Sequence, residues 1–427
     1  APGHYFLVTK VLRAKIQRPR TSAMDNYSRA MARPGSAAHV DVDTFHNLYP
    51  HQQVGSLNLR ASQAFVKNSQ NQVISYQPTT NDANALKTAG SYTDFRLLSG
   101  HIIKTATIHL TVRNETAANI PWPTRRHWHF SPIDRVEILG EGGSLLIQRL
   151  DREALCQKVN LLTPNALDHM MGSSNDATSA VMLEVDGMGE AYYPLFGAIF
   201  EHTLCLAALN SPIVVRVYWA GAAGWTMAVA PTMVSCTLVT EQDKLAQREH
   251  QELVQSLRSG PPSDIRFNRQ TFQRMTEHLE PNSRYVFPLT SVAGLVTSLH
   301  ISLRTTTSRM PGPSHKFQTL DILSGSGVSM LGGTPVSANY VKLVRAIMRE
   351  NERNDAEDGW LPITFTDDSA NHENSGILSG YMVFDNTMQL AVTTPSTLPA
   401  GSYEIYILVN RVACLRQAGG TLSIMES

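Results

Sequence analysis

Thr107–Arg113 has the sequence TIHLTVR, and about 190 residues later Ser298–Arg304 has the related sequence SLHISLR. Both alternate apolar and polar side chains, which is typical of a half-buried β-strand. Further pairs of related segments follow in the same order: Asp134–Leu146 with Leu320–Leu331, Phe200–Ala208 with Phe384–Val392, and Ile213–Trp219 with Tyr403–Val409. Because several blocks recur in one order, the chain is predicted to contain two copies of one strand-rich unit.

The composition is that of a globular, strand-rich protein. The chain has 427 residues, 42% hydrophobic and 17% charged, with 36 basic and 36 acidic side chains. This length predicts two or three domains with ample core material. There is no apolar run long enough for a membrane helix, and the N-terminal segment lacks the pattern of a secretory signal. The four cysteines, Cys156, Cys205, Cys236 and Cys414, lack paired spacing and are expected to be buried free thiols.

Positive charge is concentrated in the first 34 residues. Only Asp25 offsets seven basic residues there, which leaves about six excess positive charges. Apolar residues are interleaved with them, so residues 1–80 are interpreted as a basic amphipathic arm and lead-in, which suits a lipid headgroup layer, a phosphate backbone or an acidic neighbour. The alternative is a solvated tail with no ligand. The basic residues of this arm are Lys10, Arg13, Lys15, Arg18, Arg20, Arg29 and Arg33.

Helices are expected at a few places between the strands. Glu241–Arg258 lacks Gly and Pro and is followed by Gly260-Pro261-Pro262, so it is predicted to be a linker helix. Thr163-Pro164 and Thr334-Pro335 are predicted to begin short excursion helices, the second ending near Arg353. Phe267–Leu279 is expected to be short helical or irregular structure. The glycine clusters that begin at Gly140 and Gly325 are predicted to be hairpin turns.

Patterns that indicate catalysis are weak. His127 and His129 have the spacing of two ligands on one face of a strand, but no neighbouring pattern completes a metal site. There is no Gly-x-Ser-x-Gly motif and no glycine-rich loop with phosphate-binding spacing. We therefore expect no catalytic residue, no metal and no cofactor, and the protein is predicted not to be an enzyme.

Two tandem strand-rich modules, joined by a helix and preceded by a basic arm, resemble the double jelly-roll major capsid proteins of the tectivirus-like lineage of viruses. This resemblance implies an all-β fold of two tandem eight-stranded jelly-roll sandwiches with short excursion helices and a linker helix. The corresponding division is an arm over 1–80, a first jelly roll over 81–240, a linker helix over 241–265 and a second jelly roll over 266–427.

The resemblance also implies a function. Three chains would form a trimer, a pseudo-hexameric capsomer that tiles an icosahedral shell, so the protein would be located in the virion. The basic arm would face inward, toward an internal membrane, the viral genome or minor capsid proteins, and no small-molecule substrate is expected. The segments 116–129, 172–180 and 353–376 would supply the outer crown or trimer contacts. Candidate interface anchors are Trp122, Trp128, Trp225 and Trp360.

Two other classes share parts of this pattern. A tandem β-sandwich carbohydrate-binding or adhesion protein would have the same strands and would place aromatic residues on one exposed sheet face. A bicupin-like metalloenzyme would have the same duplication and would use His127 and His129 as ligands. A virus shell built from single jelly rolls is a nearer alternative.

Overall fold

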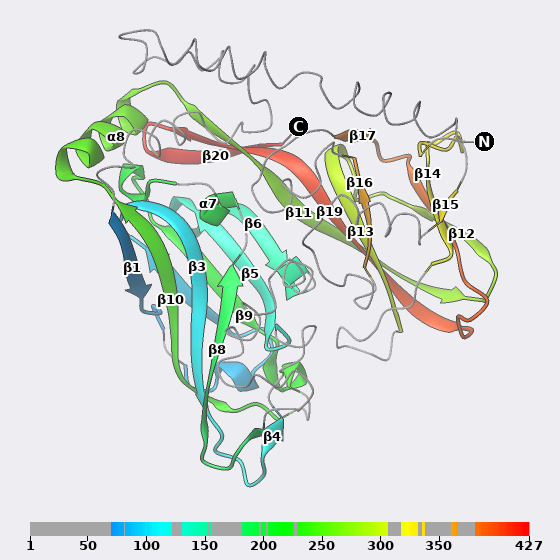
Figure 1. The fold of residues 1–427 in the computed structure, drawn as a ribbon, viewed down its shortest axis with the longest axis horizontal. Coiled ribbons are helices and arrows are strands. Elements are labelled where there is room, and N and C mark those ends of the chain that lie inside the picture. The colour runs from blue at the N-terminus through cyan, green and yellow to red at the C-terminus, as the bar shows by residue number, and fades with distance from the viewer. Residues whose placement is uncertain are drawn as a thin grey trace, which may run out of the picture.

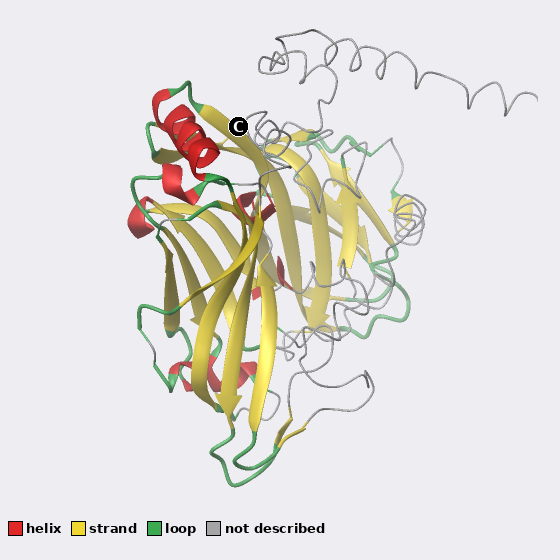
Figure 2. Cartoon of the chain, turned by 60° about the vertical axis from the view of Figure 1, so that its left-hand side comes forward, coloured by secondary structure: helices red, strands yellow, loops and turns green. Residues whose placement is uncertain are grey.

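The computed structural model describes the two strand-rich parts of the chain. The described residues are 70–80, 82–98, 100–121, 130–152, 154–155, 182–195, 198–201, 204–225, 229–305, 317–331, 335–337, 360–365 and 381–426. Residues 1–69 of the arm and lead-in, and the excursion segment that begins at Thr163, therefore lie outside the described residues. Figures 1 and 2 show two bodies made almost entirely of strands, with one longer helix, α8 (Gln247–Ser259), at one end.

The first barrel consists of two four-stranded antiparallel sheets. One sheet has the order β1-β10-β3-β8 and the other has the order β2-β9-β5-β6. The bounds of the first sheet are β1 Gln70–Tyr76, β10 Thr232–Lys244, β3 Ile102–Arg113 and β8 Met188–Leu195. Those of the second are β2 Tyr92–Leu97, β9 Ile213–Trp219, β5 Ile133–Gly140 and β6 Leu145–Asp151.

The second barrel has two sheets of the same kind. Their orders are β11-β19-β13-β16, with β17 beside β13 and β20 beside β19, and β12-β18-β14-β15. The first sheet comprises β11 Ser263–Leu279, β19 Gly401–Ala418, β13 Gly294–Thr305, β16 Trp360–Thr364, β17 Met382–Phe384 and β20 Thr421–Glu426. The second comprises β12 Arg284–Pro288, β18 Gln389–Thr393, β14 Thr319–Leu323 and β15 Val336–Ser337.

The two barrels are wound alike. If the eight main strands of each are counted in chain order, the sheets read first-eighth-third-sixth and second-seventh-fourth-fifth in both. This arrangement is the eight-stranded jelly roll. The predicted fold class, two tandem jelly rolls with a linker helix, is therefore confirmed.

The internal repeats match this winding only in part. Thr107–Arg113 and Ser298–Arg304 both lie in the third strand of their barrel, β3 and β13, and the second pair begins in the fourth, β5 and β14. The final pair does not correspond, because Ile213–Trp219 forms a seventh strand whereas Tyr403–Val409 lies within an eighth. Central strands that are buried on both faces have similar apolar sequences. The two segments therefore look like a matching pair although they occupy different positions in their barrels.

The third pair does not correspond either. Phe200–Ala208 lies across the short helices α7 (Ala198–Glu201) and η3 (Leu206–Ala208), whereas Phe384–Val392 ends within strand β18. Other short helices of the described residues include η1 Ala85–Lys87, η2 Glu141–Gly143 and η4 Gly221–Gly224. η2 joins the paired strands β5 and β6, so the predicted hairpin turn at Gly140 is confirmed.

Three helix predictions need correction. Residues 241–244 extend β10 and pair with β1, so the linker helix begins at Gln247. The prediction of short helical or irregular structure over Phe267–Leu279 is wrong. This segment belongs to β11, which pairs with β19 along its whole length. The helix predicted from Thr334-Pro335 does not start there, since Val336–Ser337 pairs with β14; residues 338–353 lie outside the described residues. In each case, inter-strand pairing overrides local propensity.

The first barrel shares its core with strands of the second barrel. Its hydrophobic cluster contains Ile265 and Phe267 from β11, Ala413 and Leu415 from β19, and Leu422 from β20. Among the described residues, the buried members of the second barrel's cluster all lie within 279–409. The pair β19–β20, which we call the C-terminal hairpin, therefore closes one end of the first barrel.

Polar contacts hold the C-terminal hairpin in place. The Asn210 N–H donates to the Gly420 carbonyl at 2.8 Å, and the Asn210 side-chain amide donates to the Gly419 carbonyl at 3.0 Å. The Leu422 N–H donates to the Glu141 carboxylate. Both Asn210 and Glu141 belong to the first barrel, so the two barrels interlock.

Candidate assembly surfaces

The predicted interface anchors have different positions. Trp122 and Trp128 lie outside the described residues, as do His127 and His129 and the seven basic residues of the arm. Trp360 begins β16 and pairs with Ser302 of β13. Trp225 is only 2% exposed and belongs to the core of the first barrel. The prediction that Trp225 is a surface anchor is therefore corrected: it is a core residue of the subunit.

Burial of Trp225 follows from the segment that carries it. The short helix η4 places it directly after Gly224, whose backbone carbonyl accepts a hydrogen bond from the buried Ser131 hydroxyl at 2.6 Å. Trp219 is also fully buried, and its Nε1 donates to the Thr93 Oγ1 at 2.9 Å. A large aromatic ring in a turn can therefore face its own barrel, which the sequence pattern did not reveal.

The outer face of the second sheet of the first barrel carries a continuous array of arginine and tyrosine side chains. The register places Tyr92, Tyr218 and Arg135 side by side across β2, β9 and β5, with Asp94, Arg216 and Glu137 in the adjacent row. Since alternate residues of a strand share a face, both rows point outward. We call these six residues the arginine–tyrosine ladder: Tyr92, Asp94, Arg135, Glu137, Arg216 and Tyr218.

Ion pairs and ring contacts fix the ladder. Arg216 donates to both carboxylate oxygens of Asp94, at 2.7 Å and 2.8 Å, and these hydrogen bonds raise the pKa of Arg216. Its guanidinium lies 4.5 Å from the centre of the Tyr92 ring. Arg135 donates to Glu137 at 2.9 Å and lies 3.6 Å from the centre of the Tyr218 ring.

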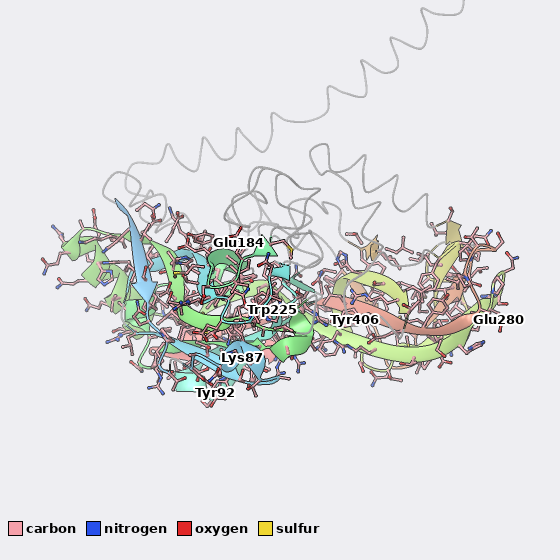
Figure 3. All side chains as sticks on the ribbon, turned by 90° about the horizontal axis from the view of Figure 1, so that it is seen from below. Lys87, Tyr92, Glu184, Trp225, Glu280 and Tyr406 are labelled. Carbon is pink, nitrogen blue, oxygen red and sulfur yellow. The ribbon has the colours of Figure 1, made fainter. Side chains whose placement is uncertain are left out.

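This surface has the composition of protein–protein interfaces. Tyr92 is 49% exposed, and Figure 3 shows it at the periphery of the first barrel, whereas Tyr406 lies where the two barrels meet. Tyrosine and arginine are enriched in such interfaces, and side chains already held in place lose little entropy on binding. The ladder is thus a pre-organised candidate contact surface.

A second candidate surface lies at the tip of the first barrel, opposite α8 (Figure 1). There β4 (Ile120–Pro121) pairs with β7 (Met182–Leu183), which brings the start of the predicted contact segment 116–129 beside the residues that follow segment 172–180. The fully buried Asn114 donates to the carbonyls of Ala118 and Leu183. Exposed apolar side chains at this tip are Met182, Val185 and Met188.

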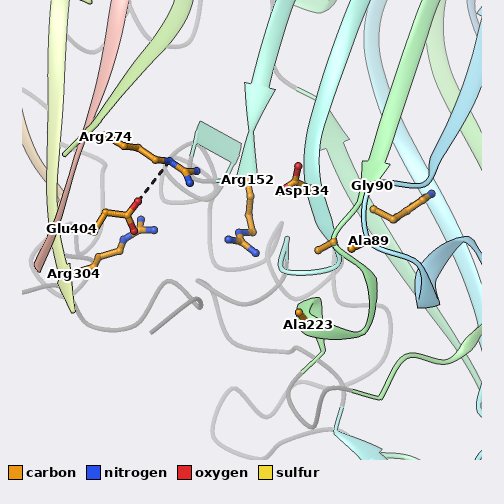
Figure 4. A pocket seen from close by; sticks show the side chains of 10 residues that line it. Ala89, Gly90, Asp134, Arg152, Ala223, Arg274, Arg304 and Glu404 are labelled. Atoms are coloured by element: carbon orange, nitrogen blue, oxygen red, sulfur yellow. Dashed lines mark ion pairs between the residues drawn. The ribbon is translucent and has the colours of Figure 1, made fainter. Parts of the chain in front are cut away.

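A cavity of about 360 Å³ opens between the barrels (Figure 4). Arg152 lines it from the first barrel, and Arg274, Arg304 and Glu404 line it from the second. Arg274 and Glu404 form an ion pair at 3.7 Å. Polar side chains of both barrels line the cavity, so we interpret it as part of the contact between the two barrels.

The described residues show no constellation for metal or thiol chemistry. Among them, no group of three His, Cys, Asp or Glu side chains could hold a metal ion. Cys205, Cys236 and Cys414 form no disulfide, as predicted; Cys205 and Cys236 are buried, whereas Cys414 is only half-buried, and Cys156 lies outside these residues. Burial raises the pKa of Cys205 and of Cys236. Within the described ranges, no helix has the length and apolar character needed to cross a bilayer.

The winding of the two barrels defines the chain as a double jelly-roll protein. VP54 of PBCV-1, fitted into a reconstruction of the virophage Sputnik, matches it with a TM-score of 0.64 and 13% identity over 84% of this chain and 97% of that one. The Faustovirus major capsid protein matches with a TM-score of 0.54 and 8% identity, over 84% and 90% of the two chains.

A chain of the Sputnik virophage structure matches with a TM-score of 0.52 and 10% identity, over 84% of this chain and 89% of that one. No protein-family model and no curated protein sequence matches the chain. At such low identities, the similarity establishes the fold, and it spans both barrels.

Proposed function

We propose that this chain is a structural capsid protein, which forms the shell of an icosahedral virus. The observation that carries the proposal is the twice-repeated jelly-roll winding, which matches viral capsid proteins over most of both chains. Identically wound barrels in one polypeptide are expected of a subunit that offers two similar blocks to its neighbours. The protein would accordingly reside in the virion.

The assembly that we propose is a homotrimer. Three chains with two barrels each contain six similar blocks, so threefold symmetry suffices to give a pseudo-hexameric capsomer. The arginine–tyrosine ladder and the tip around Met188 are the surfaces that we assign to contacts between copies. Trp122, Trp128 and Trp360 remain candidate anchors of these contacts.

We further propose that the basic arm faces the inside of the shell. Its seven arginine and lysine residues suit the phosphates of an internal membrane or of the viral genome, or an acidic minor capsid protein. This role involves binding without turnover, so no substrate, cofactor or metal is proposed.

We also propose that the chain folds as an arm, two barrels and a linker, close to the predicted division. Two facts adjust its bounds: β1 begins at Gln70, and the linker helix ends at Ser259. β11 and the C-terminal hairpin contribute core residues to the first barrel although they belong to the second. The proposed division therefore follows the strand order, whereas the hydrophobic cores cross it.

Electron microscopy of the purified protein tests the capsid proposal. We expect a threefold particle with a hexagonal outline and three times the subunit mass.

Tyr92→Ala should weaken the trimer about tenfold or more in dissociation constant, because it removes an exposed aromatic residue of the ladder. The matched control is Val328→Ala, an exposed residue of the second barrel. A monodisperse monomer that binds glycans on an array would contradict the proposal and favour a carbohydrate-binding protein.

A further inference from the structure

Helix α8 connects the two barrels and docks on the first. Leu253 and Leu257 pack with Ile102, Cys205 and Ala208 in a small apolar cluster of their own. At the end of the helix, Arg258 donates to three successive backbone carbonyls, those of Ala207 at 3.0 Å, Ala208 at 3.2 Å and Leu209 at 3.3 Å. This docking fixes where the chain leaves the first barrel.

A pair of histidines forms the next contact of this helix. His250 of α8 lies against His101, which directly precedes β3; the ring centroids are 4.9 Å apart and the rings are inclined by 65°. Nδ1 of each ring is buried and has no hydrogen-bond partner. The backbone of His101 is held by the Gln242 side chain, whose Oε1 accepts from the His101 N–H at 2.9 Å. Two neutral rings pack well in this geometry, whereas two protonated rings repel each other.

Cations and carboxylates both lie on the elements that carry the pair. Lys244, at the end of β10, adds positive charge near His101. Asp243 is engaged by Lys104 at 2.8 Å, and Arg258 adds a further cation at the end of α8. The helix itself carries two carboxylates near His250: Glu249, next to it in the sequence, and Glu252, which pairs with Arg248 at 2.8 Å. On the η3 side, the buried Cys205 thiol stays neutral.

We propose that His101 and His250 form an acid-sensitive clasp, which holds α8 on the first barrel at neutral pH and releases it when both rings are protonated. This inference goes beyond the capsid function, because it concerns the link between the barrels within a single chain.

The direction of the pH dependence follows from the environment of the rings. Burial lowers the pKa of both histidines, and His250 and Lys244 lower that of His101 further. A histidine in the undocked helix has its ordinary pKa of about 6.5 and binds a proton more readily. The stabilisation of the docked helix is therefore complete above about pH 6.5 and is lost as the pH falls through the lowered values.

Hydrogen exchange of the full chain at pH 7.5 and pH 5.0, corrected for the intrinsic pH dependence of exchange, tests the clasp. We expect the amides of residues 247–259 to lose about tenfold in protection at pH 5.0. His101→Gln and His250→Gln should keep the protection at pH 7.5 and show a much smaller loss in acid. The matched control, His278→Gln, replaces an exposed histidine of β11 that pairs with Glu280 and should respond like the wild type.

Equal protection of α8 at both pH values would overturn the proposal. So would a double Gln variant with the acid response of the wild type, because the response would then belong to other groups. If the variants fold poorly, NMR titration of the wild-type imidazole signals decides, since a pair that titrates at or above 6.5 excludes the clasp. These measurements use the isolated chain, so a failure of the capsid proposal leaves their outcome unaffected.

Discussion

Trp225 illustrates how much a residue's role depends on its neighbours. The sequence shows a tryptophan in a Gly- and Ala-rich segment, a context that suits an exposed anchor as well as a core residue. In the structure it is almost fully buried, together with Trp219, in the core of the first barrel. Residue type alone could not separate these roles, because burial depends on where the turn η4 aims the side chain.

Trp225→Ala is expected to destabilise the isolated subunit. Loss of a buried indole leaves a cavity, so the free energy of unfolding should fall by about 3–5 kcal/mol. Urea denaturation of the subunit measures this change. Val286→Ala, at an exposed position of β12, should change it by less than about 0.5 kcal/mol. A variant with unaltered stability but weakened association would return Trp225 to the interface.

At the scale of elements, the sequence allowed the third and fourth strands of each barrel to be predicted, along with the linker helix and the hairpin turn at Gly140. These elements carry local signals: alternation of apolar residues, an uninterrupted helical stripe, and glycines at a turn. β11 carries no such signal, because polar residues such as Arg269, Gln270 and Gln273 recur along it. It is a strand because β19 pairs with it over 17 residues.

The same limit applies to the arginine–tyrosine ladder. Its members come from three strands that are distant in sequence, and only the register of β2, β9 and β5 aligns Tyr92, Tyr218 and Arg135. The histidine pair likewise joins residues that are about 150 positions apart. Pairing across a sheet has no single-sequence signature, so such sites become visible only in the fold.

Strand β20 provides a test of the shared core. Leu422→Ala removes a side chain that is 6% exposed and packs in the core of the first barrel, and should lower the free energy of unfolding by about 2–4 kcal/mol. Hydrogen exchange should locate the loss of protection in β5 and β6. Met425→Ala, on the same strand but 36% exposed, is the control. Loss of protection confined to β20 would contradict the closing role of the C-terminal hairpin.

At the scale of the whole molecule, the two barrels depend on each other unequally. The core of the second barrel is built from residues 279–409, whereas the first borrows five core residues from β11, β19 and β20. The internal sequence repeat did not predict this asymmetry. Two barrels can have the same strand order even when only one of them needs strands of the other to complete its core.

Expression of the halves should reveal the asymmetry. Residues 70–260 alone are expected to expose apolar surface, to bind a hydrophobic dye and to unfold without a sharp transition. Residues 261–427 alone should unfold cooperatively, as judged by circular dichroism in urea. A cooperative transition for the first fragment would show that its core is complete without the C-terminal hairpin.

The closing role of the C-terminal hairpin has a consequence for synthesis in the cell. Domains usually fold in order as they leave the ribosome, the N-terminal one first. Here the N-terminal barrel must wait for residues 413–424, so a nascent or truncated chain keeps an open end that quality-control proteases can recognise. Only full-length polypeptides would then reach the native fold, and the last residues of the chain would report that synthesis is finished.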